Sequence, residues 1–223
     1  MRTLVFDSET TGLAKTQIIS PSTIHLWPHI VQFSYIVFDT ESNKIVKVKD
    51  SIIKVPDGFT ITEENAKIHG ITTEISLAKG EDLLPVLEEF FADFDSADHI
   101  VGHNVSFDIN MIKAELQRLI INNFNTKLQE YLTKMNTSTK FHCTMQENVE
   151  LCAIEMKDKY GRLYKKFPKL VELYQKIFGV TPKNLHNSLN DVIVCLRCFI
   201  KLKYEIDIIE HSEQVKQMIK DYL

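Results

Sequence analysis

The sequence has 223 residues, of which 44% are hydrophobic and 25% charged, and its formal net charge is −4 at pH 7. These values are those of an ordinary globular protein, so they exclude a disordered chain, and the negative charge argues against a protein that coats nucleic acid non-specifically. No apolar stretch is long enough to cross a bilayer, and the chain opens on a strand-like run instead of a leader, so we expect a cytoplasmic protein with no membrane partner.

The first half of the sequence predicts three strands followed by two helices. The first strand ends where residues 10–12 break its apolar pattern, and residues 40–43 favour a turn between the other two. Thr62 then begins a helix that ends near Gly70, after which apolar residues recur at helical spacing. The predicted strands are 3–7, 30–39 and 45–55, and the predicted helices are 62–70 and 83–94.

The second half predicts two more short strands and four helices. The strands are 99–102 and one near 140–144, and the helices are 105–120, 124–134, 170–178 and a long one from 187 onward. The sequence shows no internal repeat and no linker. We therefore predict one α/β domain over residues 1–223, with a core of about 3–200 and a helical tail at 201–223.

Charged residues are unevenly distributed along the chain. Residues 81–98 contain seven acids and no lysine or arginine, and we interpret these acids as the solvated face of a helix. Residues 157–183 contain eight basic and two acidic residues, with Tyr160, Tyr164 and Phe167 among them. That segment is either a solvated lysine-rich loop or a surface that grips a nucleic-acid strand upstream of its end.

The cysteines do not form a recognisable metal or disulfide pattern. Cys195 and Cys198 have the spacing of half a zinc knuckle, but no second pair supplies the other two ligands. They also lie in an apolar helical run, so we predict reduced thiols in the core.

Three clusters of polar residues are candidates for chemistry. Asp7 and Glu9 lie two apart in the first strand, so their carboxylates point to the same face, where a divalent cation would relieve their repulsion. Asp108 falls in the first turn of a helix that Asn104 or Ser106 begins, where the helix dipole favours a negative charge.

The third cluster is His186 followed by Asp191. The histidine lies just before a helix that Asn187 or Ser188 caps, and the acid lies one turn inside it. This arrangement is either an ordinary cap or a general base beside a metal ligand, a role that suits histidine because it titrates near working pH.

In this order along the chain, the clusters resemble the DEDDh exonucleases, the DnaQ-like family that includes the proofreading subunit of the bacterial replicative polymerase, RNase T and oligoribonuclease. The matching strings are FDSETTGL at 6–13, GHNVSFD at 102–108 and HNSLND at 186–191. Weaker matches lie at 68–72, 143–145 and 167–173, so the resemblance runs from about residue 4 to residue 199.

The resemblance implies an RNase H-like fold, with a mixed five-stranded sheet flanked by helices, and a metal-dependent 3′–5′ exonuclease that releases nucleoside 5′-monophosphates. It implies that two Mg²⁺ or Mn²⁺ ions are held by Asp7, Glu9, Asp108 and Asp191, with His186 as the general base. His69 would contact substrate or simply cap the end of a helix. The positions that contact the terminal nucleotide in relatives match Thr10, Leu13, His69, Asn104 and Phe107.

The expected substrate is the 3′ end of DNA, single-stranded or frayed, and the further expected partner is a DNA polymerase subunit in replication, repair or proofreading. An exoribonuclease or oligoribonuclease is the alternative, because recognition of the 2′-hydroxyl depends on the geometry around Glu9 and Leu13. A catalytically silent binding module is the alternative from another class. That module is expected to lose one of the five catalytic residues, and all five are present.

Overall fold

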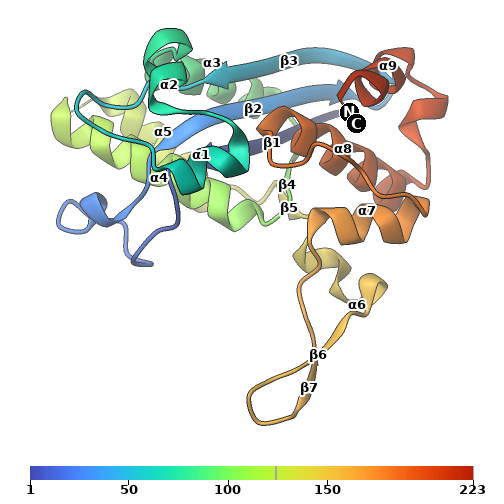
Figure 1. Cartoon of the computed structure of the whole chain (residues 1–223). Coiled ribbons are helices and arrows are strands. Elements are labelled where there is room, and N and C mark those ends of the chain that lie inside the picture. Colours follow the sequence, from blue (N-terminus) through green and yellow to red (C-terminus); the bar gives the residue numbers. More distant parts are fainter. Residues whose placement is uncertain (124, 223) are drawn as a thin grey trace.

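The computed structural model describes residues 1–123 and 125–222 and is built on one mixed five-stranded sheet (Figure 1). The strand order is β3-β2-β1-β4-β5, in which β1, β2 and β3 pair antiparallel while β1, β4 and β5 pair parallel. This confirms the predicted α/β fold with its mixed sheet. The strands are β1 (Arg2–Thr10), β2 (Ile30–Asp39), β3 (Lys44–Ile52), β4 (His99–Gly102) and β5 (Phe141–Cys143).

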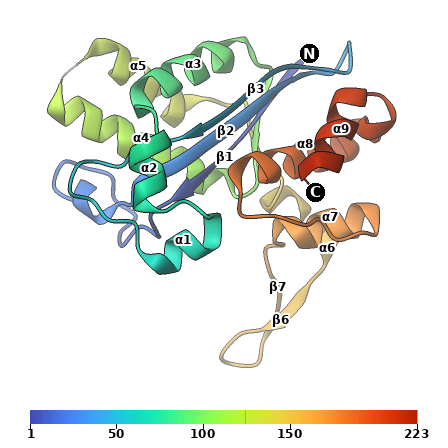
Figure 2. The same cartoon turned by 45° about the horizontal axis from the view of Figure 1, so that its top comes forward.

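Helices cover both faces of the sheet (Figures 1 and 2). One face packs against α3 (Leu83–Ser96), α4 (Val105–Asn122) and α5 (Thr126–Thr137), and the other against α7 (Leu170–Phe178), α8 (Ser188–Tyr204) and α9 (Glu213–Tyr222). Within the described residues, none of the helices combines the length and apolarity needed to cross a membrane. The smaller helices are α1 (Glu63–His69), α2 (Thr73–Lys79) and α6 (Val149–Cys152), with 3₁₀ turns at Ile24–Leu26, Gln146–Asn148 and Ile208–Glu210.

Strand β1 lies at the centre of the sheet and divides the core in two. Leu4 and Phe6 point toward α3 and α4, and Val5 points toward α8, so the run 4–6 is continuously apolar rather than alternating. Side chains two apart share a face, so Asp7 and Glu9 continue the row that Val5 begins. The sequence of β1 therefore directs both carboxylates toward α8.

The loop between β1 and β2 is fastened to α4. Arg118 donates hydrogen bonds to the backbone carbonyls of Ile24, Trp27 and Pro28, while Glu115 pairs with Arg118 and accepts from the backbone N–H of Ile30. Opposite charges and backbone partners therefore satisfy a buried carboxylate, as burial of a charge requires. These bonds fix the segment that follows the end of β1.

Most predicted elements are present, and the differences involve short ones. The predicted helix 124–134 corresponds to α5, and its first residue lies outside the described residues. Helix α2 was not predicted, and neither was a two-stranded hairpin of β6 (Glu155–Lys157) and β7 (Leu163–Lys165). Cys195 and Cys198 are buried in α8, as expected of core thiols.

Candidate active site

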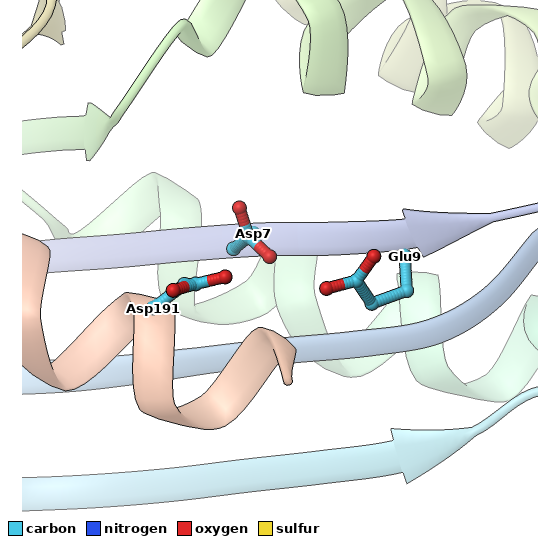
Figure 3. Close-up of side chains that lie close together, drawn as sticks. All are labelled: Asp7, Glu9 and Asp191. Atoms are coloured by element: carbon cyan, nitrogen blue, oxygen red, sulfur yellow. The ribbon is translucent and has the colours of Figure 1, made fainter. Parts of the chain in front are cut away.

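Three acidic side chains converge where β1 meets the start of α8. One carboxylate oxygen each from Asp7, Glu9 and Asp191 lie within 4.8 Å of one another (Figure 3). Two hydrogen bonds set this geometry: the Ser188 hydroxyl donates to the backbone carbonyl of Asp7 at 2.7 Å, and the Asn187 side chain caps α8. The first turn of α8 is thereby fixed against β1, and Asp191 faces the strand.

The three carboxyl groups are held in an unfavourable electrostatic environment. Burial raises the pKa of Asp7 to about 7. Burial and the neighbouring charge of Asp7 raise the pKa of Glu9 to about 8. Burial and the charges of Asp7 and Glu9 raise the pKa of Asp191 to about 8. Without a cation, the cluster therefore binds protons that isolated carboxylates release.

The cluster has the composition and the spacing of a divalent cation site. Carboxylate oxygens are the ligands that Mg²⁺ prefers, and two oxygens on opposite sides of one ion lie about 4.2 Å apart. Oxygens within 4.8 Å of one another need to close by only a fraction of an ångström to share an ion. A cation would also remove the repulsion that raises the three pKa values.

Asp108 reaches β1 from the other side, out of the first turn of α4. Its Oδ1 accepts hydrogen bonds from the backbone N–H of Ser8 at 2.9 Å and from the Ser8 hydroxyl at 2.6 Å. Burial and the charge of Asp7 raise the pKa of Asp108 well above its usual range. The fourth predicted acid is thus electrostatically linked to Asp7 but lies outside the group of three, and its role as a metal ligand stays a prediction.

His186 lies at the rim of the cluster, in the loop before α8. Its side chain is exposed, its backbone has the left-handed φ of 69°, and its N–H donates to Asp191 Oδ2 at 3.2 Å. The backbone of His186 is therefore tied to one of the three acids while its ring faces solvent. Its role as a general base stays a prediction.

The residues predicted to contact a nucleotide surround the same end of β1. The Thr10 hydroxyl donates to the Gly12 carbonyl at 2.7 Å, and Gly12 has a φ of 142°, which lets the chain turn and leaves Leu13 80% exposed. Asn104, which begins α4 in the left-handed region, is exposed, and Phe107 packs partly against the core.

His69 is buried where α1 ends, beside the end of β1. Its Nδ1 accepts from the Ile71 N–H at 3.2 Å, and burial lowers its pKa against an opposing effect of the Thr10 backbone. The cap of α1 is made by Gly70, so His69 is not needed for it. Its predicted contact with substrate stays a prediction.

Several residues support the site through tertiary contacts that the sequence does not predict. Ser8 and Ser188 orient Asp108 and α8, and Gln32 Oε1 accepts from the backbone N–H of Ser188 at 3.3 Å. The His103 ring joins Thr144 Oγ1 and the Pro168 carbonyl, each at 3.0 Å, and burial lowers its pKa to about 4. Both partners of His103 are distant in sequence, so the local pattern around it does not reveal them.

The electrostatics of the cluster predict how stability changes with pH in the absence of metal. Because folding raises the carboxyl pKa values to about 7 and 8, the folded state retains protons that the unfolded state has lost. The stability that these three groups contribute is therefore fully present only below their unfolded pKa values and is lost as pH rises through 8; we expect a loss of about 2–3 kcal/mol between pH 7 and 8.5.

Urea unfolding with EDTA measures this slope. The buried histidines, whose pKa values are lowered, are neutral in both states above pH 7 and do not contribute there. Glu9→Gln and saturating Mg²⁺ should each reduce the change in the free energy of unfolding between pH 7 and 8.5. A metal-free protein that becomes more stable over this range would contradict the assignment.

Comparisons with known proteins identify the family and the fold. The family model described as exonuclease, of the RNase T type, matches residues 4–199. A structure of E. coli exonuclease I with a dT13 oligonucleotide matches with a TM-score of 0.60 and 19% identity over 92% of this chain and 42% of that one. A second, with dA16, matches with a TM-score of 0.58 and 18% identity over 92% and 41%.

A product-bound exonuclease I structure gives a TM-score of 0.58 and 17% identity over 92% of this chain and 44% of that one. The chain thus spans about two fifths of the length of these proteins. At this identity the likeness shows a shared fold. No curated protein matches the sequence.

Proposed function

The chain belongs to the RNase T family of exonucleases, and we propose that it is a 3′–5′ exonuclease that uses divalent cations to shorten DNA from single-stranded or frayed 3′ ends. The observation that carries this proposal is the convergence of Asp7, Glu9 and Asp191, whose oxygens lie within 4.8 Å of one another. Phosphodiester hydrolysis needs positive charge beside the reacting phosphate, and an acidic cluster of this kind acquires that charge by binding cations.

The four acids of the site would hold two Mg²⁺ or Mn²⁺ ions. Asp7, Glu9 and Asp191 offer adjacent oxygens, and Asp108 stands beside Asp7 from the α4 side. Bound cations would supply a more acidic water and stabilise the charge that develops on the phosphate and the leaving oxygen. The four negative side chains would then be balanced before substrate arrives.

We assign His186 the role of general base. Its exposed ring lies at the rim of the acidic cluster, where it would accept the proton of the attacking water. The water oxygen forms a bond to phosphorus as the P–O3′ bond of the terminal linkage breaks. The leaving 3′-oxygen takes up a proton from solvent and stays on the shortened strand as its 3′-hydroxyl, and the product is a nucleoside 5′-monophosphate.

The terminal nucleotide would lie between the end of β1 and the start of α4. Leu13 and Phe107 offer apolar surfaces on which a base stacks or wedges, and we assign Thr10, His69 and Asn104 the polar contacts to the same nucleotide. Single-stranded DNA is favoured by the likeness to E. coli exonuclease I, whose structures contain dT13 and dA16.

A time course on 5′-labelled single-stranded DNA and on RNA of matched sequence tests the proposal. With Mg²⁺ we expect a ladder that shortens from the 3′ end, faster on DNA than on RNA, and no shortening with EDTA. Faster RNA shortening would replace DNA by RNA as the substrate. No shortening of either polymer, with Mg²⁺ or Mn²⁺, would refute the assigned chemistry.

A further inference from the structure

The β6–β7 hairpin projects away from the body of the protein (Figures 1 and 2). The strands pair in register from Glu155–Lys165 to Lys157–Leu163, and the Asp158 carbonyl accepts from the Gly161 N–H at 2.9 Å. Gly161 has the φ of 81° that such a turn requires. The Asp158 carboxylate accepts from the backbone of the turn, so the tip has a defined shape without support from the core.

The side chains of the hairpin are apolar, aromatic and basic, yet they face solvent. Met156, Tyr160, Leu163, Tyr164 and Phe167 are 44–71% exposed, and within the described residues the three hydrophobic core clusters contain none of them. A group of exposed apolar side chains on one projection marks an interaction surface.

The charges of the hairpin identify the class of partner. Residues 155–167 contain five basic and two acidic residues. At the tip, Lys159 Nζ lies 5.0 Å and Arg162 Cζ 5.3 Å from the centre of the Tyr160 ring. Aromatic rings interleaved with cations match the bases and phosphates of a single strand. An acidic protein surface would neutralise the charges but leave the rings without partners.

The base of the hairpin is fixed to the same edge of the sheet as the active site. The Lys166 N–H donates to the Ile154 carbonyl at 2.9 Å and closes the hairpin, and the next turn of chain brings the Pro168 carbonyl to His103 at 3.0 Å. His103 follows β4 directly and precedes Asn104, where α4 begins. Because β1 and β4 are parallel, their carboxyl ends meet at this edge, so the projection begins beside the acidic cluster.

We propose that the β6–β7 hairpin is an arm that holds single-stranded nucleic acid upstream of the 3′ end being cut. Tyr160 and Tyr164 stack on bases, and Lys157, Lys159 and Arg162 contact phosphates. The inference builds on the proposed exonuclease function and adds a second site, which gives long strands an affinity that short ones lack.

Binding is measured in an Asp7→Asn background, so that the strand is not degraded. Tyr160→Ala with Tyr164→Ala should weaken binding of a single-stranded dT20 about tenfold or more. Binding of dT3, too short to reach the arm, should not change. Lys157→Ala with Lys159→Ala should reduce the slope of log affinity against log salt by about 1.4, since each phosphate contact contributes about 0.7. A parallel series with rU20 distinguishes RNA from DNA as the strand held.

Two matched variants control for these effects. Tyr160→Phe with Tyr164→Phe keeps the rings and should retain affinity for dT20. Lys44→Ala with Lys220→Ala removes two exposed lysines. Lys44 lies opposite Asp39 in the β2–β3 strand register, at the far end of the sheet from Asp7, so the slope of log affinity against log salt should not change.

In the background with Asp7 intact, the rate on dT20 is compared with that on thymidine 5′-p-nitrophenyl phosphate, a small ester. The tyrosine-to-alanine pair should lower the ratio of the two rates about tenfold. Alanine variants that bind dT20 as tightly as the parent would overturn the arm even if the protein is an active exonuclease. Hairpin-dependent binding without hydrolysis would support the arm and count against the proposed function instead.

Discussion

Exonuclease activity is expected to fall by about three orders of magnitude or more when Asp7 is replaced by asparagine. Bound cations contribute several kcal/mol to such a transition state, and each 1.4 kcal/mol is about a factor of ten in rate. Asp7 is the central acid of the site, because its charge acts on Glu9, on Asp108 and on Asp191. Single-turnover rates on 5′-labelled DNA with saturating Mg²⁺ measure the loss.

The same substitution should stabilise the metal-free protein at pH 8. Burial raises the pKa of Asp7 to about 7, so ionisation of this side chain opposes folding, whereas asparagine keeps its size without a charge. We expect the unfolding midpoint to rise by a few degrees, since one kcal/mol corresponds to about 2–4 °C in a chain of this size. Asp57→Asn, at an exposed acid, should change neither quantity. An Asp7→Asn protein that keeps full activity, or that loses activity only because it unfolds, would refute the assignment.

Replacement of His186 by asparagine is expected to lower the hydrolysis rate by about 10²- to 10⁴-fold, the usual contribution of a general base. Asparagine is the informative substitution because it tolerates the left-handed conformation that His186 adopts at φ 69°, so the loop before α8 should keep its shape. The affinity for Mg²⁺ should not change, because the carboxylates remain in place.

Two readouts separate a base from a residue that only shapes the loop. The pH profile of the single-turnover rate should lose its dependence on the neutral imidazole, and added imidazole should restore part of the rate because the His186 side chain faces solvent. His211→Asn, at another exposed histidine, should show neither effect. An unchanged pH profile with no rescue would assign His186 a structural role.

The fold was predictable because its main elements are encoded locally. The apolar run of β1 and the β-branched run of β2 each indicate a strand buried on both faces, and the helical spacing of α3 indicates a helix with one buried face. The two-residue alternation of side chains along β1 also predicted that Asp7 and Glu9 lie on one face. Proximity of Asp191 could not be derived in this way, because it depends on how α8 docks, and only the resemblance to a family suggested it.

What the sequence did not predict depends on tertiary contacts. Helix α2 has seven residues and little periodicity, and it is held by the Ser76 hydroxyl, which donates to the Ile53 carbonyl and accepts from the Val55 N–H. The hairpin lacks the buried face that makes strands recognisable, since its strand residues are all exposed. Asp108 was predicted to be a metal ligand with the other three acids. Its hydrogen bonds from the Ser8 N–H and hydroxyl were not predicted, because they depend on how α4 packs against β1.

The docking of α8 against β1 also sets when the active site forms during synthesis. Asp7 is synthesised well before Ser188, whose hydroxyl bonds to the Asp7 carbonyl, and before Asp191, because most of the domain lies between them in the sequence. At a synthesis rate of about 5–20 residues per second, roughly 10–40 s pass between the synthesis of Asp7 and that of Asp191. During that interval the nascent chain can build most of its sheet but cannot complete its cation site. Hydrolysis is therefore withheld from every incomplete chain that stops before α8.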